Sequence, residues 1–202
     1  ESGGGAKIST LLAMPAAGGL FHRAVIQSGP GLSCVPAERA AAYARDALAA
    51  AGIEDPRAAS TEELLQATAA GGLMAFGPVL DGEHAPQHPG VAMAEGSAID
   101  VPVIIGVNQD EFGTDDAIDD AKLRRRLAAL REDRVEEIIT TYRSMFPGCT
   151  NAQLLRWATA DATFRAGSIK LAEQCWAGGM AAPLYQYFFT YEIQGLAAHG
   201  YE

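Results

Sequence analysis

Three short segments of this chain carry side chains that could together perform nucleophilic catalysis. The first is Glu1–Gly5 (ESGGG), which leads directly into a predicted helix. A serine between small residues at the start of a helix is typical of a nucleophile elbow, a sharp turn that presents the hydroxyl at the helix N-terminus, where developing negative charge is stabilised. The same residues also fit a flexible linker or an ordinary helix N-cap, so this motif alone does not identify a nucleophile.

The other two segments could supply an acid and a base. Asp110 and Glu111 lie in Gly106–Gly113, directly after a strand-like run, and either carboxylate could orient a histidine and stabilise its positive charge. His199 follows a second strand-like run and could act as the general base. Taken singly, these segments also fit a solvated acidic loop and a surface histidine. Taken together, the order serine, acid, histidine predicts a catalytic triad of the α/β-hydrolase type.

The predicted elements would bring the three segments to one edge of a sheet. Strands are expected at 24–28, 101–107 and 184–191, and the β-branched run 101–107 is expected to be a central strand buried on both faces. Functional groups gather at the carboxyl ends of parallel strands. Helices are expected at 6–14, at 38–51, after a capping box of Ser60 and Glu63, once or twice within 118–146, and at 151–181 after a second capping box of Thr150 and Gln153, where Gly167 could interrupt the helix. This alternation predicts an α/β domain with a mostly parallel sheet flanked by helices.

Composition excludes several other functions. The net charge of −10, from 15 basic and 25 acidic side chains, argues against general affinity for nucleic acid or anionic membranes. No apolar run is long enough to span a membrane. The three cysteines lack metal-ligand spacing, His84 and His88 are separated by a proline that disfavours a helix, and no phosphate-binding or dinucleotide-binding motif is present. We therefore expect no metal and no cofactor.

The chain resembles the type-B carboxylesterases, the family that includes cholinesterases and bacterial para-nitrobenzyl esterases. Its first residues match the Gly-Glu-Ser-Ala-Gly elbow, Gly106–Phe112 matches the Gly-Val-Asn-Lys-Asp-Glu-Gly acid motif, and His199–Glu202 matches the histidine motif. Residues 20–29, 76–82 and 159–173 also agree with the family. The resemblance implies that residues 1–202 form the C-terminal portion of a catalytic α/β-hydrolase domain. The chain is then expected to be a fragment that lacks the N-terminal part and the C-terminal end of that domain.

The resemblance also implies a role for individual residues. Ser2 would be the nucleophile, His199 the base, and Glu111 rather than Asp110 the acid. Gly3 would supply one N–H of the oxyanion hole, where the family usually has alanine.

Residues around the triad have expected roles too. The resemblance implies that Glu1 and Ser28 form a polar shell around it, although simple structural hydrogen bonding fits both equally well. Leu73–Phe76 could line an acyl pocket, with plain core as the alternative for Phe76. Phe112 replaces the family's usual glycine, so the local turn is expected to differ.

The resemblance implies hydrolysis of small-molecule carboxylic esters through an acyl-enzyme. Two alternatives are a non-catalytic, cholinesterase-like binding or adhesion module and an inactive fragment of an esterase. No motif indicates a protein partner or a compartment.

Overall fold

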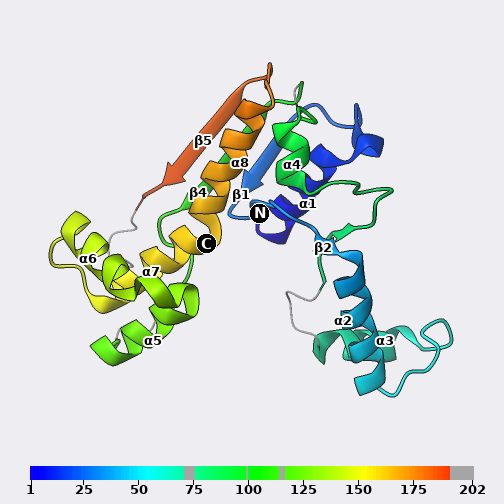
Figure 1. Cartoon of the computed structure of the whole chain (residues 1–202), viewed down its shortest axis with the longest axis horizontal. Helices are drawn as coiled ribbons and strands as arrows, with labels where there is room; N and C mark the ends of the chain where they lie inside the picture. The colour runs from blue at the N-terminus through cyan, green and yellow to red at the C-terminus, as the bar shows by residue number, and fades with distance from the viewer. Residues whose placement is uncertain (71–75, 99, 114–116, 192–202) are drawn as a thin grey trace.

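A parallel sheet forms the centre of the molecule. In this computed structural model its strands are β1 (Ala24–Gln27), β4 (Val103–Asn108) and β5 (Leu184–Phe189), in the order β1-β4-β5 (Figure 1). The structure describes residues 1–70, 76–98, 100–113 and 117–191. The prediction that the β-branched run forms the central strand is confirmed, because β4 pairs with a strand on each side.

Helices cover one face of this sheet. They are α1 (Gly3–Ala13), α4 (Pro89–Ala94) and α8 (Ala166–Ala177), and α4 contacts both of the others (Figure 1). A short 3₁₀ helix, η1 (Pro15–Ala17), follows α1. The buried core between helices and sheet comprises Leu12, Ala24, Ile26, Met93, Ala98, Val103, Ile105, Leu171 and Cys175. Burial of this apolar surface is the main force that holds these helices on the sheet.

The opposite face of the sheet is open in the described part of the chain. Side chains alternate between the two faces of a strand, and the registered trio Val25, Ile104 and Tyr185 is 42%, 40% and 61% exposed. The expectation that the central strand is buried on both faces was therefore wrong for Ile104. The physical reason is that α1, α4 and α8 pack against the face that carries Ile26 and Ile105.

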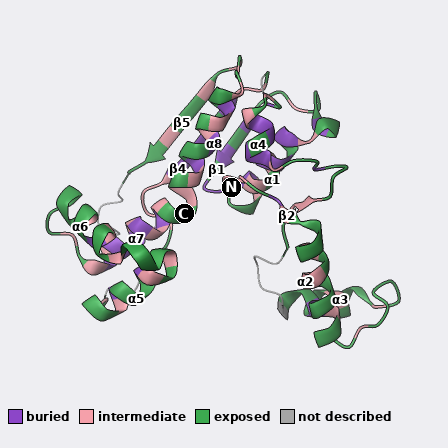
Figure 2. Cartoon of the chain, viewed as in Figure 1, coloured by how far each residue is buried: buried purple, intermediate pink, exposed green. Residues whose placement is uncertain are grey.

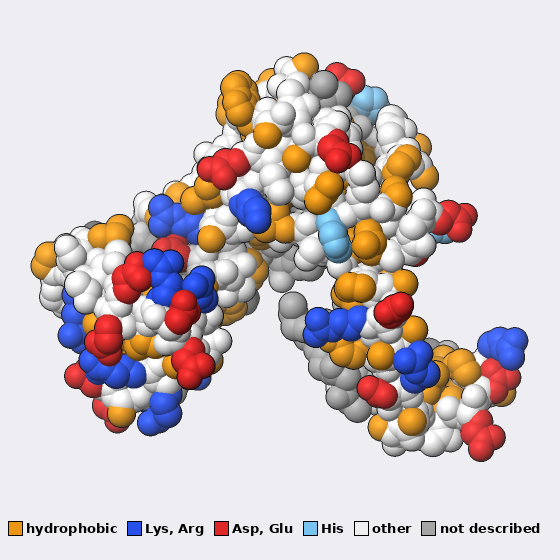
Figure 3. All heavy atoms as spheres, in the orientation of Figure 1, with side chains coloured by type: hydrophobic (Ala, Val, Ile, Leu, Met, Phe, Trp, Pro, Cys, Tyr) orange, Lys and Arg blue, Asp and Glu red, His pale blue; other side chains and the backbone are white. Residues whose placement is uncertain are grey.

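A second cluster of helices adjoins the carboxyl end of the sheet. It contains α5 (Asp120–Arg131), the 3₁₀ turn η3 (Glu132–Arg134), α6 (Val135–Met145) and α7 (Asn151–Ala160). Its own core comprises Leu123, Leu127, Ile139, Leu154, Leu155 and Ala158. Figure 3 shows acidic and basic side chains interspersed over the visible surface of this cluster. Such mixing gives no single-sign patch on that surface.

A continuous helical path connects this cluster to the sheet. The capping box of Thr150 and Gln153 is confirmed, and it opens α7. The path continues through a π-helical segment, η4 (Asp161–Arg165), into α8, which ends at Ala177. The helix is thus shorter than the expected 151–181, and its irregularity lies before Gly167 rather than at it.

The remaining helices form an arm. A short parallel ladder of β2 (Val35–Pro36) and β3 (Val79–Leu80) adjoins α2 (Ala37–Ala50), and α2 packs against α3 (Thr61–Ala70). The capping box at Ser60 and Glu63 is confirmed, with hydrogen bonds in both directions. Most of the arm is exposed or half-buried (Figure 2). No helix in the described part of the chain is both long and apolar enough to cross a bilayer.

Candidate active site

The elbow around Ser2 has the sharp turn that its sequence predicts. Ser2 has φ 49° and ψ −123°, in the region that side-chain-bearing residues seldom adopt. Its amide donates to the carbonyl of Gln27, the last residue of β1, at 2.9 Å. Helix α1 begins at the next residue, Gly3, three positions earlier than expected. Ser2 is exposed and lies immediately before the helix N-terminus, where a serine hydroxyl could attack a bound carbonyl compound.

Glycines let the elbow pack closely against the loop that follows β1. A Cβ atom on Gly29 would lie 1.9 Å from the Ser2 carbonyl oxygen, and a Cβ on Gly5 would lie 2.7 Å from the Gly29 carbonyl oxygen. Neither contact is possible between real atoms. The Ser28-Gly29 pair after the strand and the small residues of the elbow are therefore parts of one tight junction.

Among the described residues, the first turn of α1 leaves one amide without an acceptor. The amides of Gly4 and Gly5 donate to the carbonyls of Glu1 and Ser2. The amide of Gly3 has no acceptor among the described residues. Free amides at a helix N-terminus are suited to binding an anion. Gly3 can thus offer an N–H beside the Ser2 hydroxyl, and its role in an oxyanion hole stays a prediction.

Glu111 lies at the neighbouring strand end. Its Oε1 accepts a hydrogen bond from Ser28 Oγ at 2.6 Å and another from the Asn108 amide at 2.6 Å. Ser28 is buried, has φ 45°, and donates its amide to the Gly106 carbonyl at 2.9 Å. The structure therefore brings two of the predicted site residues, Ser28 and Glu111, into direct contact.

Ser2 and Glu111 are linked through two consecutive residues. Gln27 receives the Ser2 amide, and Ser28 bonds the Glu111 carboxylate. Both side chains thus belong to the carboxyl edge of the sheet, formed by the ends of β1 and β4. This is the edge at which parallel α/β sheets usually bind ligands.

The third member of the predicted triad, His199, lies outside the described residues. The strand before it, β5, ends at Phe189, which is registered with Asn108 and accepts the Gln109 amide at 2.8 Å. The chain therefore leaves β5 at the same edge that carries Ser2 and Glu111.

Asp110 points to a different partner. Its Oδ1 lies 2.7 Å from Arg156 Nε, and the two side chains are 27% and 7% exposed. The atoms are close but not aligned as a hydrogen bond, and neither has another partner among the described residues. The contact is therefore a tight ion pair. Sequence reasoning missed Arg156, although a lone arginine in the apolar run Leu154-Leu155-Arg156-Trp157 was a visible signal.

The other predicted residues have less definite surroundings. The Glu1 side chain is exposed, and its role in a polar shell stays a prediction. Of the expected acyl pocket Leu73–Phe76, only Phe76 lies within the described residues, and it is 51% exposed. Phe112 stacks on Phe164 with ring centroids 5.5 Å apart.

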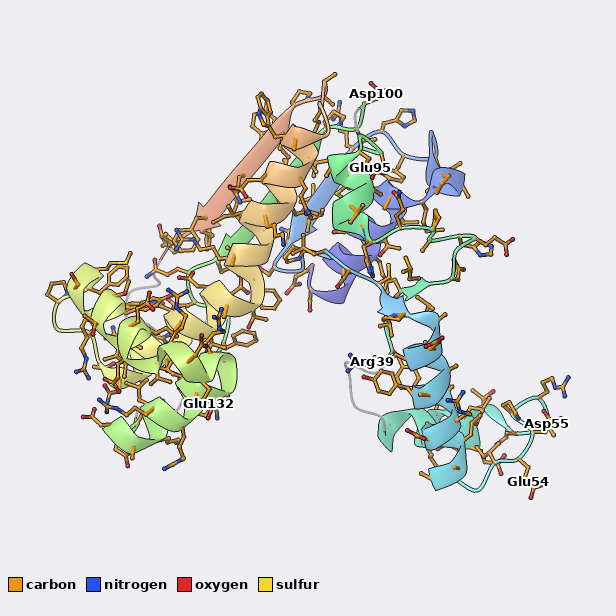
Figure 4. The ribbon with its side chains drawn as sticks, in the orientation of Figure 1. Arg39, Glu54, Asp55, Glu95, Asp100 and Glu132 are labelled. Carbon is orange, nitrogen blue, oxygen red and sulfur yellow. The ribbon has the colours of Figure 1, made fainter. Side chains whose placement is uncertain are left out.

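In the described part of the chain, neither a metal-binding cluster nor the cavity beside α1 contributes to this site. Within the described ranges no group of three His, Cys, Asp or Glu residues could hold a metal ion. The acidic side chains labelled in Figure 4 lie apart, on the arm (Glu54, Asp55), near α4 (Glu95, Asp100) and in the α5–α7 cluster (Glu132). A cavity of about 340 Å³ lies at the C-terminal end of α1, opposite to Ser2, and is lined by residues such as Leu11, Met14 and Phe21.

A parallel sheet with covering helices, a serine elbow before a helix and a carboxylate at the next strand end define an α/β-hydrolase architecture. The model of the carboxylesterase family matches residues 1–199, and this chain belongs to that family. The fold of a carboxylesterase from Geobacillus stearothermophilus superposes with a TM-score of 0.74 at 30% identity, over 98% of this chain and 44% of that one. A solved para-nitrobenzyl esterase superposes with a TM-score of 0.68 at 28% identity, over 96% of this chain and 43% of that one.

Curated relatives agree with this assignment. The para-nitrobenzyl esterase of Bacillus subtilis is 36% identical over 124 residues, 55% of this chain and 25% of that protein. Carboxylesterase 1C of Rattus norvegicus is 26% identical over 219 residues, 95% of this chain and 40% of that protein. The chain thus spans between a quarter and two fifths of the length of these two relatives.

Proposed function

We propose that this chain carries the catalytic residues of a serine hydrolase that cleaves small-molecule carboxylic esters through an acyl-enzyme. The observation that carries the proposal is the junction of Ser2, Gln27, Ser28 and Glu111, in which a strained serine elbow and an anchored carboxylate share one sheet edge. Membership of the carboxylesterase family supports the same chemistry. The relatives named para-nitrobenzyl esterase and cocaine esterase support ester substrates.

In the proposed mechanism, His199 takes the proton from the Ser2 hydroxyl as Oγ attacks the ester carbonyl carbon. Glu111 orients the imidazole and stabilises its positive charge. Its Oε1 already accepts two hydrogen bonds, and Oε2 receives none from the described residues, which leaves that oxygen for the imidazole N–H.

The Gly3 amide stabilises the oxyanion of the tetrahedral intermediate. Protonated His199 then gives its proton to the leaving alcohol as the C–O bond breaks, and the acyl group stays on Ser2. A water molecule, deprotonated by His199, attacks the acyl carbon and releases the acid and the free serine. These steps need neither a metal ion nor a cofactor.

A fluorophosphonate probe, which modifies activated serines, tests this proposal on the protein expressed from its complete gene. The probe should label the peptide that contains Ser2. Ser2→Ala should abolish labelling and lower the turnover of a short-chain nitrophenyl ester by roughly 10⁴-fold or more. Ser33→Ala, a change at an exposed serine elsewhere, should leave both unchanged.

Two results would contradict the proposal. Near wild-type hydrolysis by Ser2→Ala would show that another residue is the nucleophile. A folded wild-type protein that neither labels nor hydrolyses any short-chain ester would instead favour a binding module.

A further inference from the structure

We propose that Arg156 and Phe164 are positioning residues that aim Glu111, because they hold the two residues that flank it in sequence. This inference rests on the proposed function, in which Glu111 is the acid of the triad. Both residues belong to the continuous helical path from α7 through η4, so one rigid element would set the direction of the acid loop.

The polar contact on one side of Glu111 is the ion pair of Asp110 with Arg156. Arg156 is 6% exposed and sits on α7 beside Leu154 and Leu155, which are 0% and 2% exposed. Its Nε lies 2.7 Å from Asp110 Oδ1. The backbone of Arg156 is therefore held in place by the apolar residues packed around α7. Its guanidinium group extends to the loop after β4.

Stability alone does not explain this ion pair. Moving two charges out of water costs several kcal/mol, and well-packed apolar residues of similar volume usually stabilise a protein as much or more. Once the pair has formed, however, separating it is costly, because it leaves the buried charge of Arg156 without its partner. We infer that the Asp110–Arg156 pair selects one conformation of the loop.

The aromatic contact on the other side of Glu111 is the stack of Phe112 on Phe164. The rings lie 5.5 Å apart with an interplanar angle of 22°. Phe164 belongs to η4, and the next residue, Arg165, lies over the Phe188 ring of β5 at 4.2 Å. The π-helical segment thus contacts both the acid loop and the neighbouring strand.

The contacts of the loop alternate in direction. Asp110 and Phe112 contact the α7–η4 helix, whereas Glu111 between them contacts Ser28 and Asn108 at the strand ends. These residues follow the end of β4 at Asn108, with bends at Gln109 and Phe112, so their directions are set by their contacts rather than by strand pairing. Holding the two flanking side chains against the helix therefore turns Glu111 toward the sheet edge that carries Ser2.

The test uses the protein expressed from its complete gene, with kcat and KM measured on a nitrophenyl ester. The concentration of active enzyme is taken from fluorophosphonate titration, so that unfolded protein does not count. Arg156→Met should lower kcat by about 10- to 100-fold and leave KM within about twofold, because a misplaced catalytic group affects the transition state more than substrate binding. Arg156→Lys should recover part of the loss, since it restores the charge.

A double variant separates positioning from folding. Arg156→Met combined with Asp110→Asn leaves no uncompensated buried charge, so it should melt closer to the wild type than Arg156→Met does, while its kcat stays low. Phe164→Leu tests the second contact without changing any charge and should also lower kcat at nearly unchanged KM. Arg124→Met is the matched control, because the Arg124–Glu136 pair is exposed and joins α5 to α6.

The outcomes distinguish this inference from the proposed function. If Ser2→Ala abolishes labelling but the double variant and Phe164→Leu both keep the wild-type kcat, the positioning role is wrong and the proposed function stands. If Ser2→Ala retains hydrolysis, the proposed function itself is wrong. A fall in the titrated active fraction without a fall in kcat would assign Arg156 a purely structural role and would also overturn the inference.

Discussion

The Ser28 hydroxyl donates a 2.6 Å hydrogen bond to Oε1 of Glu111 and so ties the end of β1 to the loop after β4. The two residues are far apart in sequence, and Ser28 reaches the carboxylate from a buried position with φ 45°. A non-glycine residue at positive φ is strained and persists only where the surroundings hold it. The Ser2 amide donates to the carbonyl of Gln27, the residue before Ser28. This strained turn therefore connects the proposed nucleophile with the proposed acid.

Loss of the Ser28 hydroxyl should weaken catalysis without abolishing it. In Ser28→Ala, Oε1 of Glu111 keeps the Asn108 amide but loses one of its two donors. We expect a fall in kcat of roughly 10-fold and a loss of about 1.5–3 kcal/mol in the free energy of unfolding, the usual range for a hydrogen bond to a charged group. Kinetics and urea denaturation measure the two effects. Thr68→Ala, which removes a hydroxyl from exposed α3, is the control, and equal kcat in both variants would contradict the expectation.

Substitutions of the two adjacent acids, Asp110 and Glu111, should lower kcat by very different amounts. Glu111→Gln removes the charge that faces the imidazolium and should lower kcat by about 10³- to 10⁴-fold, as for the acid of other triads. Asp110→Asn weakens only the ion pair with Arg156. It should lower kcat by about 10-fold, because the loop that carries Glu111 is displaced. Steady-state kinetics on titrated enzyme rank the two variants. The reverse order would show that Asp110, the competing acid of the sequence motif, is the residue that meets the histidine.

Features specified by neighbouring residues were predictable from the sequence. The β-branched run around Ile104 and Ile105 predicted a central strand, because such residues pack well on a pleated surface. The two capping boxes were predictable for the same local reason, since Ser60 with Glu63 and Thr150 with Gln153 satisfy helix amides within one turn. The elbow at Ser2 also follows from its own glycines.

Features that depend on distant residues were not predictable. No local rule connects Asp110 with Arg156, which meet only when α7 packs beside the sheet edge. The two-residue strands β2 and β3 carry too short a pattern to detect. The unbroken β-branched run suggested burial of Ile104 on the second face of the sheet, but exposure is decided by which helices pack there. The π-helical turn at Phe164 likewise has no sequence signature.

Alanine substitutions at two glycines near Ser2, Gly29 and Gly3, should change the stability of the protein in opposite directions. A Cβ on Gly29 would lie 1.9 Å from the Ser2 carbonyl oxygen, so Gly29→Ala must displace the elbow. We expect a loss of about 1–3 kcal/mol, typical of overpacking, together with a large fall in fluorophosphonate labelling of Ser2. A Cβ on Gly3 meets nothing within 4 Å, and Gly3→Ala should stabilise α1 by up to about 1 kcal/mol. Similar melting temperatures for the two variants would contradict the described junction.

Burial should make the thiol of Cys175 slow to react with alkylating reagents. Cys175 is 2% exposed, packs against Met93 Sδ at 3.6 Å, and burial raises its pKa to about 11. Iodoacetamide reacts with thiolates, so at pH 8 it should modify the half-buried Cys149 well before Cys175, whose thiolate fraction is on the order of 10⁻³. Mass spectrometry of labelled peptides measures the order of reaction.

The same thiol should make stability fall at high pH. The folded pKa lies above the unfolded value of 9.0, so the stabilising effect of burying the neutral thiol is complete below pH 9. It is lost as pH rises from 9 toward 11, because the unfolded chain ionises first, and the loss attributable to this group is at most about 2–3 kcal/mol. Urea denaturation at pH 8 and pH 10.5 measures it, and Cys175→Ala should show a smaller decline between these pH values than the wild type. A decline of equal size in both proteins would assign the alkaline sensitivity to other groups.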